Sequence, residues 1–180
     1  RLLTHILKSI SEAWFELGQT YQNKSVPDGL GYLKFRNKSF VYGFDSKLKE
    51  KSKYSKGLTS IERRNQTKYI NNLKTQARNY GGLKSWLIVV KSEVDYPKFK
   101  KSIEKLKIES GFKRIKLLST EPLLKICDIY QIAIREGVVN KEIFQEFLYK
   151  LVSYKGDITL EKVKKTFSKV PQFQALSIKF

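Results

Sequence analysis

The chain has 180 residues, and its 36 Lys and Arg against 17 Asp and Glu give a formal net charge of +19 at pH 7. That excess favours polyanionic partners such as nucleic acid, although a lysine-rich composition without such a partner would produce it too. One cysteine (Cys127) and one histidine (His5) exclude an internal disulfide and a His/Cys metal cluster, which leaves Mg²⁺ or Mn²⁺ on oxygen ligands.

The first part of the chain predicts a helix followed by a β-hairpin. Apolar residues recur at helical spacing over residues 2–17, which indicates an amphipathic helix there. Two apolar and aromatic segments, 32–35 and 40–45, flank a two-residue turn at Arg36-Asn37 and predict the hairpin.

Helices dominate the rest of the predicted structure. A helix begins at Thr59 or Ser60, with Glu62 as a capping signal, and extends to residue 79. The apolar run 86–90 predicts a strand buried on both faces. Because a hairpin comes first and later strands are flanked by helices, we expect an α/β fold with a mixed central β-sheet. The other predicted elements are a basic helix at 97–109, a strand at 112–118, and helices at 121–136, 140–153 and 159–168.

The apolar content and the start of the sequence bear on its cellular context. No apolar run approaches the roughly 20 residues of a membrane span, and the opening residues lack the layout of a signal peptide. The sequence contains no Met. We therefore expect residues 1–180 to form a single domain, excised from a longer protein that works in the reducing cytoplasm of a bacterium without membrane contact.

Two short acidic motifs carry the strongest functional signal, Pro27-Asp28-Gly29 and Asp45-Ser46-Lys47. Side chains two residues apart on a strand share a face, so Asp45 and Lys47 point the same way. The hairpin register that pairs Phe35 with Lys38 also sets Asp28 directly across from Asp45. Their Cβ atoms would then be roughly 5 Å apart.

This pairing of acidic residues suits a metal-dependent reaction. Two carboxylates this close repel each other, and one would take up a proton unless a cation lay between them. Mg²⁺ takes one or two carboxylates together with water and phosphate oxygens, and Mn²⁺ could substitute. Asp28 and Asp45 are therefore the candidate metal ligands, and with Lys47 they are the candidate catalytic residues for phosphodiester hydrolysis. The alternative is an ordinary Pro-Asp-Gly turn and a chance Asp-x-Lys in a lysine-rich chain.

Asp28 together with Asp45-Ser46-Lys47 resembles the signature of the PD-(D/E)xK nuclease superfamily. The likeness extends through residues 27–167 toward the cleavage domains of type IIS restriction endonucleases. Two later segments carry it: the helix with Arg63, Arg64, Gln66 and Tyr69-Ile70-Asn71-Asn72, and the stretch from Leu118-Ser119-Thr120-Glu121-Pro122 to the closing helix in residues 156–167.

The resemblance implies a restriction-endonuclease-like fold and a Mg²⁺-dependent cut in double-stranded DNA, near a site that another domain of the full-length protein recognises. It also implies that two catalytic domains pair to cut both strands. The helix at the expected dimer face carries Arg63, Arg64 and Lys68 with only Glu62 nearby, so like charges there would repel.

Weaker candidates surround the predicted site. Related nucleases carry a supporting glutamate on the first helix, and Glu12 is the nearer match, although a solvated surface Glu is the alternative. Gln66 and Tyr69 could order the site, with a core role for Tyr69 as the alternative. Residues 48–56 depart from the family pattern in their lysine content. The candidate DNA-binding residues are Lys49, Lys51, Lys53, Arg63 and Arg64.

Two other functions stay open on the sequence alone. A non-catalytic basic DNA-binding module would use Asp28 and Asp45 only as structural residues, and metal-dependent nicking of DNA separates it from a nuclease. A transposase subunit or a Holliday-junction resolvase would place a nuclease of the same fold on other DNA substrates. A preference for branched DNA, or a partner transposase, would favour that function.

Overall fold

In the residues that it describes, the computed structural model contains a five-stranded mixed β-sheet with the strand order β1-β2-β3-β4-β5. Strands β1 to β3 are antiparallel, whereas β3 to β5 are parallel, so the carboxyl ends of the last three strands share one edge. The strands are Ala13–Glu16 (β1), Gly29–Phe35 (β2), Lys38–Lys47 (β3), Leu83–Val90 (β4) and Ile115–Ser119 (β5). The described residues are Lys8, Ser11, Ala13–Glu16, 27–47, 57–91, 96–137 and 140–180.

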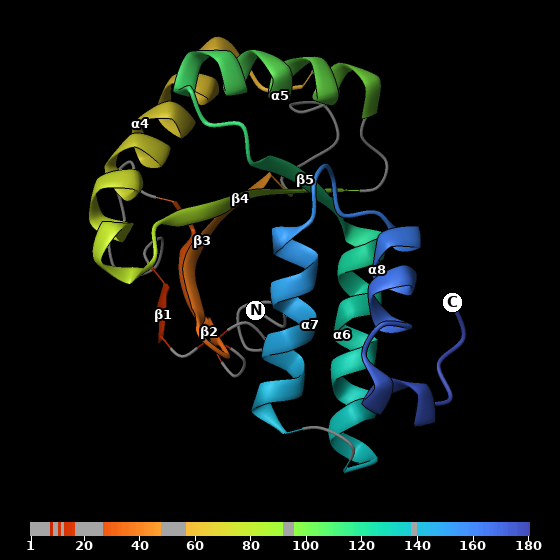
Figure 1. Ribbon diagram of the computed structural model, residues 1–180. Helices are drawn as coiled ribbons and strands as arrows, with labels where there is room; N and C mark the ends of the chain where they lie inside the picture. Colours follow the sequence, from red (N-terminus) through yellow and green to blue (C-terminus); the bar gives the residue numbers. More distant parts are fainter. Residues whose placement is uncertain are drawn as a thin grey trace.

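Helices cover both faces of the sheet (Figure 1). Helices α4 and α5 lie on one face, and α6, α7 and α8 lie on the other. This arrangement confirms the expected α/β fold with a mixed central sheet. The helices are Ser60–Gln76 (α4), Tyr96–Ser110 (α5), Thr120–Arg135 (α6), Lys141–Ser153 (α7) and Leu160–Phe167 (α8), with 3₁₀ helices Ala77–Tyr80 (η1) and Pro171–Ala175 (η2). In the described part of the chain, no helix is both long and apolar enough to cross a membrane.

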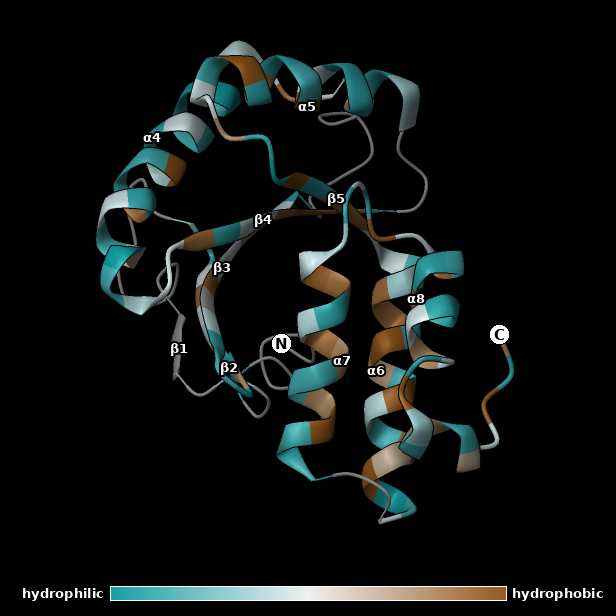
Figure 2. Cartoon of the chain, in the orientation of Figure 1, coloured by the Kyte–Doolittle hydropathy of each residue, from teal (hydrophilic) through white to brown (hydrophobic). Residues whose placement is uncertain are grey.

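Two hydrophobic clusters hold the layers together, one on each face of the sheet. Trp86 and Ile88 of β4 share a cluster with residues of α4 and α5, whereas Leu87 and Val89 share one with residues of α6 and α7. Strand β4 is therefore buried on both faces, as its continuous apolar run predicts. Figure 2 shows apolar residues along β4 and repeatedly along α6 and α7.

The predicted helix over residues 2–17 is wrong where the structure describes strand β1. Ala13–Glu16 forms an edge strand that pairs antiparallel with β2. Without it, the outer backbone groups of β2 would lack partners, and the segment contains two aromatic residues of the kind that favour strands. Pairing with β2 thus overrides the helical spacing. Most of the other residues of that predicted helix lie outside the described residues.

The β2–β3 hairpin has the predicted register. Phe35 is paired with Lys38 across the turn at Arg36-Asn37, and the pairing continues without a break to the first residue of β2. Arg36 has a φ of 53°, the left-handed conformation that two-residue hairpin turns require at their first position. This register brings Asp28, one residue before β2, beside Asp45.

The later elements match the predictions to within a few residues, apart from the start of β5. Helix α4 begins after Thr59, whose side chain and that of Glu62 form the predicted capping box. Strand β5 begins at Ile115, three residues later than predicted. Phe112 lies in the connection before β5 and packs into the cluster of α4 and α5. Its apolar side chain therefore does not mark the start of the strand.

A glycine pair determines where β4 starts beside β3. Gly81 and Gly82 end η1 with φ of 84° and 80°. The backbone N of Val41 on β3 donates to the carbonyl oxygen of Gly82 at 3.0 Å. A Cβ at position 81 would lie 2.2 Å from the carbonyl oxygen of Ser39, whereas a Cβ at position 82 would have nothing within 4 Å. The turn thus docks on β3 where β4 begins, and the β3–β4 register then shifts between Val41 and Tyr42.

Gly81→Ala should destabilise the protein more than Gly82→Ala. Both substitutions put a side chain on left-handed backbone, which costs roughly 1–2 kcal/mol. Only the Cβ at position 81 also meets the backbone of β3. We therefore expect a larger loss in the free energy of unfolding for Gly81→Ala, measured by urea unfolding followed by circular dichroism. Equal losses would show that the contact with Ser39 does not stabilise the turn.

Candidate functional site

Asp28 and Asp45 lie together at the edge where the parallel strands end. Asp28 precedes β2, and Asp45 lies near the end of the neighbouring strand β3. Oδ2 of Asp28 accepts a hydrogen bond of 2.6 Å from the backbone N of Ser46, the residue that follows Asp45. The structure therefore brings the two predicted metal ligands into one site, and Asp45-Ser46-Lys47 completes it.

Two side chains hold the Asp45 carboxylate, which is only 4% exposed. Nζ of Lys47 lies 2.6 Å from Oδ2 of Asp45, as expected for two residues that share a strand face. Nε2 of Gln66 on α4 donates to the same oxygen at 2.5 Å. The contacts come from a strand and from a helix, so they fix the carboxylate from two directions.

The electrostatics of Asp45 combine opposing effects. Burial raises the pKa of the Asp45 carboxyl above its ordinary value, and the nearby charge of Asp28 raises it further. The charge and hydrogen bond of Lys47, and the hydrogen bond from Gln66, lower that pKa without overcoming burial. A divalent cation beside both carboxylates would favour the ionised form of each.

Gln66 is itself fixed by a second hydrogen bond. Nε1 of Trp86 on β4 donates to Oε1 of Gln66 at 2.8 Å, so both ends of the amide are engaged. The Trp86 ring lies across Gly43 of β3, where a Cβ would come within 2.5 Å of the ring atom Cζ3. Gly43 therefore leaves the space that lets the indole reach Gln66. Trp86 and Gly43 carry no sequence signal for this role, because they meet only through the pairing of two distant strands.

The residues that the structure describes leave Oδ1 of each carboxylate to a ligand. The contacts of Asp45 involve Oδ2, and so does the contact of Asp28, so no described residue donates to either Oδ1 atom. Within the described ranges there is also no group of three or more His, Cys, Asp and Glu side chains that could hold a metal ion by themselves. Two carboxylates with water and phosphate oxygens are a donor set that suits Mg²⁺ or Mn²⁺.

The other predicted site residues are less closely involved. Tyr69 of α4 is half-buried, with its ring centroid 6.4 Å from that of Trp86, so it packs on the residue that holds Gln66. Arg64 is exposed on α4. The other candidates lie outside the described residues: Glu12, Lys49, Lys51 and Lys53.

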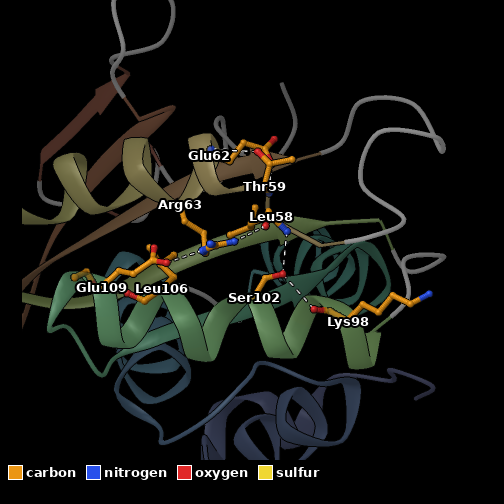
Figure 3. Close-up of polar contacts among 9 residues, drawn as sticks. Leu58, Thr59, Glu62, Arg63, Lys98, Ser102, Leu106 and Glu109 are labelled. Atoms are coloured by element: carbon orange, nitrogen blue, oxygen red, sulfur yellow. Dashed lines mark hydrogen bonds and ion pairs between the residues drawn. The ribbon is translucent and has the colours of Figure 1, made fainter.

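Arg63 and Leu58 join the amino end of α4 to α5 (Figure 3). The backbone N of Leu58 donates to Oγ of Ser102 at 3.1 Å, and Nη1 of Arg63 donates to the carbonyl oxygen of Leu58 at 3.0 Å. Nε of Arg63 pairs with Oε1 of Glu109 at 2.9 Å. The Arg63 charge is thus paired within the chain, which removes part of the repulsion expected at this face.

Comparison with known proteins supports the fold. No protein-family model matches the chain, and no curated protein sequence matches it. Among solved structures, the restriction endonuclease FokI is similar, with a TM-score of 0.55 and 15% sequence identity. The match covers 88% of this chain and 27% of the FokI chain, so this chain spans about a quarter of that chain's length. At this identity the likeness concerns architecture, and the chain has a restriction-endonuclease-like fold.

Proposed function

We propose that the chain is a Mg²⁺-dependent endonuclease domain that hydrolyses phosphodiester bonds of double-stranded DNA, with Asp28, Asp45 and Lys47 as its catalytic residues. The observation that carries this proposal is the juxtaposition of two carboxylates and an ammonium group at one edge of the sheet. Nζ of Lys47 is 2.6 Å from Asp45, and Asp28 contacts the backbone between these two residues. The restriction-endonuclease-like fold supports the same function.

The proposed roles follow from the contacts of each side chain. Asp28 and Asp45 would hold Mg²⁺ or Mn²⁺ through their Oδ1 atoms, to which no described residue donates. A bound divalent cation lowers the pKa of its water and offsets negative charge on the scissile phosphate. Lys47 now neutralises Asp45. Once a divalent cation neutralises Asp45 instead, the ammonium group of Lys47 is available to a phosphate oxygen or to the attacking water.

A finer proposal concerns the whole protein. We propose a cleavage domain of a type IIS restriction enzyme in a bacterial cytoplasm, with a separate domain that recognises the DNA sequence. Two such domains would pair to cut both strands. The pairing of Arg63 with Glu109 supports the α4–α5 side as the dimer face, and so do Ile61 and Ile108, which are 69% and 82% exposed on these helices.

Asp28→Asn and Asp45→Asn should each lower the plasmid-nicking rate by more than about 100-fold, because each removes a charged ligand without changing the shape of the side chain. Lys47→Ala should lower the same rate by about 100- to 1,000-fold, because it removes a positive charge that stabilises the transition state. Asp128→Asn is the matched control, since Asp128 is exposed on α6 and should leave the rate unchanged. A folded Asp45→Asn variant that nicks at the wild-type rate would overturn the catalytic assignment.

Nicking should require Mg²⁺ or Mn²⁺ and stop in excess EDTA. Ca²⁺ also binds carboxylate oxygens, but its larger and more flexible coordination should not support cleavage. The measurement is the nicking rate in each cation after removal of bound metal. Cleavage that persists in EDTA would rule out the carboxylate-metal mechanism. Absence of nicking with every cation would leave the chain as a DNA-binding module alone.

Gln66→Ala should lower the nicking rate by about 10- to 100-fold, as loss of a residue that orients a ligand typically does. The effect should fall on kcat more than on KM, and the fluorescence of Trp86 should change because its indole loses an acceptor. Gln145→Ala is the control, since Gln145 is also buried but lies on the opposite side of the sheet. If both variants lose activity only in proportion to lost stability, Gln66 has no positioning role.

A further inference from the structure

A basic groove lies between α7 and α8, on the face of the sheet opposite the helix that contacts Asp45. The two helices pack against each other, and the depression between them has a volume of about 320 Å³. Most of its lining consists of two tyrosines and four lysines: Tyr149, Tyr154, Lys150, Lys162, Lys165 and Lys169. We refer to it as the α7–α8 groove.

The fold holds two of these lysines in place. Nζ of Lys162 donates to two backbone carbonyl oxygens at 2.7 and 2.8 Å and lies 4.5 Å from the centre of the Tyr154 ring. Nζ of Lys150 pairs with Oε1 of Glu146 at 2.6 Å. These contacts fix the ammonium groups of Lys150 and Lys162 at the groove.

Lys165 and Lys169 carry the part of the groove's charge that no described acidic side chain neutralises. Both are exposed, and no acidic side chain among the described residues pairs with either of them. Asp157, close to the Lys162 end of the groove, directs its carboxylate elsewhere: it accepts hydrogen bonds from the backbone N of Leu117 at 2.9 Å and from Tyr96. The groove therefore presents positive charge that a ligand would neutralise.

The spacing of the lysines suits a phosphodiester backbone. Lys162, Lys165 and Lys169 are three and four residues apart, so they lie along one side of α8 and its extension. At about 1.5 Å per residue, this row extends roughly 10 Å. One strand of a DNA duplex carries phosphates at a regular interval, about 3.4 Å along the axis, so a row of this length can face more than one phosphate. Tyrosine hydroxyl groups can add hydrogen bonds to the same oxygens.

We infer that the α7–α8 groove is a second binding surface for the backbone of double-stranded DNA, separate from the Asp28–Asp45 site. The inference shares its DNA partner with the proposed function, but binding here requires neither a divalent cation nor cleavage. A duplex held in the groove would remain attached while the carboxylate site is empty. An acidic protein segment fits less well, because its carboxylates lack the regular spacing of phosphates.

The test measures how readily each lysine is acylated, by mass spectrometry, with and without a short DNA duplex in EDTA. Duplex DNA should reduce the reactivity of Lys165 and Lys169 several-fold and leave Lys113 unchanged. Lys113 is an exposed lysine just before β5 and is not among the residues that line the groove. Unchanged reactivity of Lys165 and Lys169 would overturn the inference. So would equal protection by poly-glutamate at the same charge concentration.

Paired variants supply a second readout. Lys165→Glu with Lys169→Glu should weaken duplex binding in EDTA by at least about tenfold and reduce the slope of log affinity against log salt by about 2. Lys38→Glu with Lys113→Glu makes the same change in net charge away from the groove and should have a much smaller effect. Equal losses for both pairs would mean that only total charge matters.

The nicking assay separates failure of this inference from failure of the proposed function. A protein that nicks DNA with Mg²⁺ but leaves Lys165 and Lys169 reactive would refute the groove and keep the nuclease. A protein that never nicks but protects both lysines would refute the nuclease and keep the groove.

Discussion

The carboxylate of Asp45 is buried between the sheet and α4, where a negative charge is costly unless its neighbours stabilise it. Lys47 offsets that cost with an opposite charge, and Gln66 does so with a hydrogen bond. Asp28 adds a second negative charge close by. This charge further disfavours the ionised form of Asp45, and it also makes the site more attractive to a cation. The placement of α4 over the sheet is therefore coupled to the charge state of one residue on β3.

This coupling depends on the pairing of β3 with β4. The register sets Trp86 across Gly43, and the indole then fixes the Gln66 amide that reaches Asp45. The Gly81-Gly82 turn docks on β3 at the far end of the two strands, before the register shifts between Val41 and Tyr42. A binding site needs side chains held by packing and by hydrogen bonds from a second layer of residues. Here the second layer consists of one glycine, one indole and one amide.

Local signals predicted much of the fold and part of the site. The hairpin register could be derived because a two-residue turn determines all later pairs, and this register brings Asp28 to Asp45. The start of α4 could be derived from its capping residues. Strand β1 could not, because its pairing with β2 is a tertiary interaction that outweighs helical spacing. Nor could the role of Trp86, since nothing in its own neighbourhood indicates that Gln66 is its partner.

We propose that Asp28 and Asp45 together bind a divalent cation, one residue away from the Trp86 indole, which donates to Gln66. Titration with Mn²⁺ while the indole N–H resonance of Trp86 is followed by NMR tests it most directly, since a paramagnetic ion broadens signals from nearby nuclei. We predict selective broadening of the Trp86 resonance in the wild-type protein and its loss in an Asp28→Asn, Asp45→Asn variant. A resonance that stays sharp in the wild type, or broadens equally in the variant, would contradict the account.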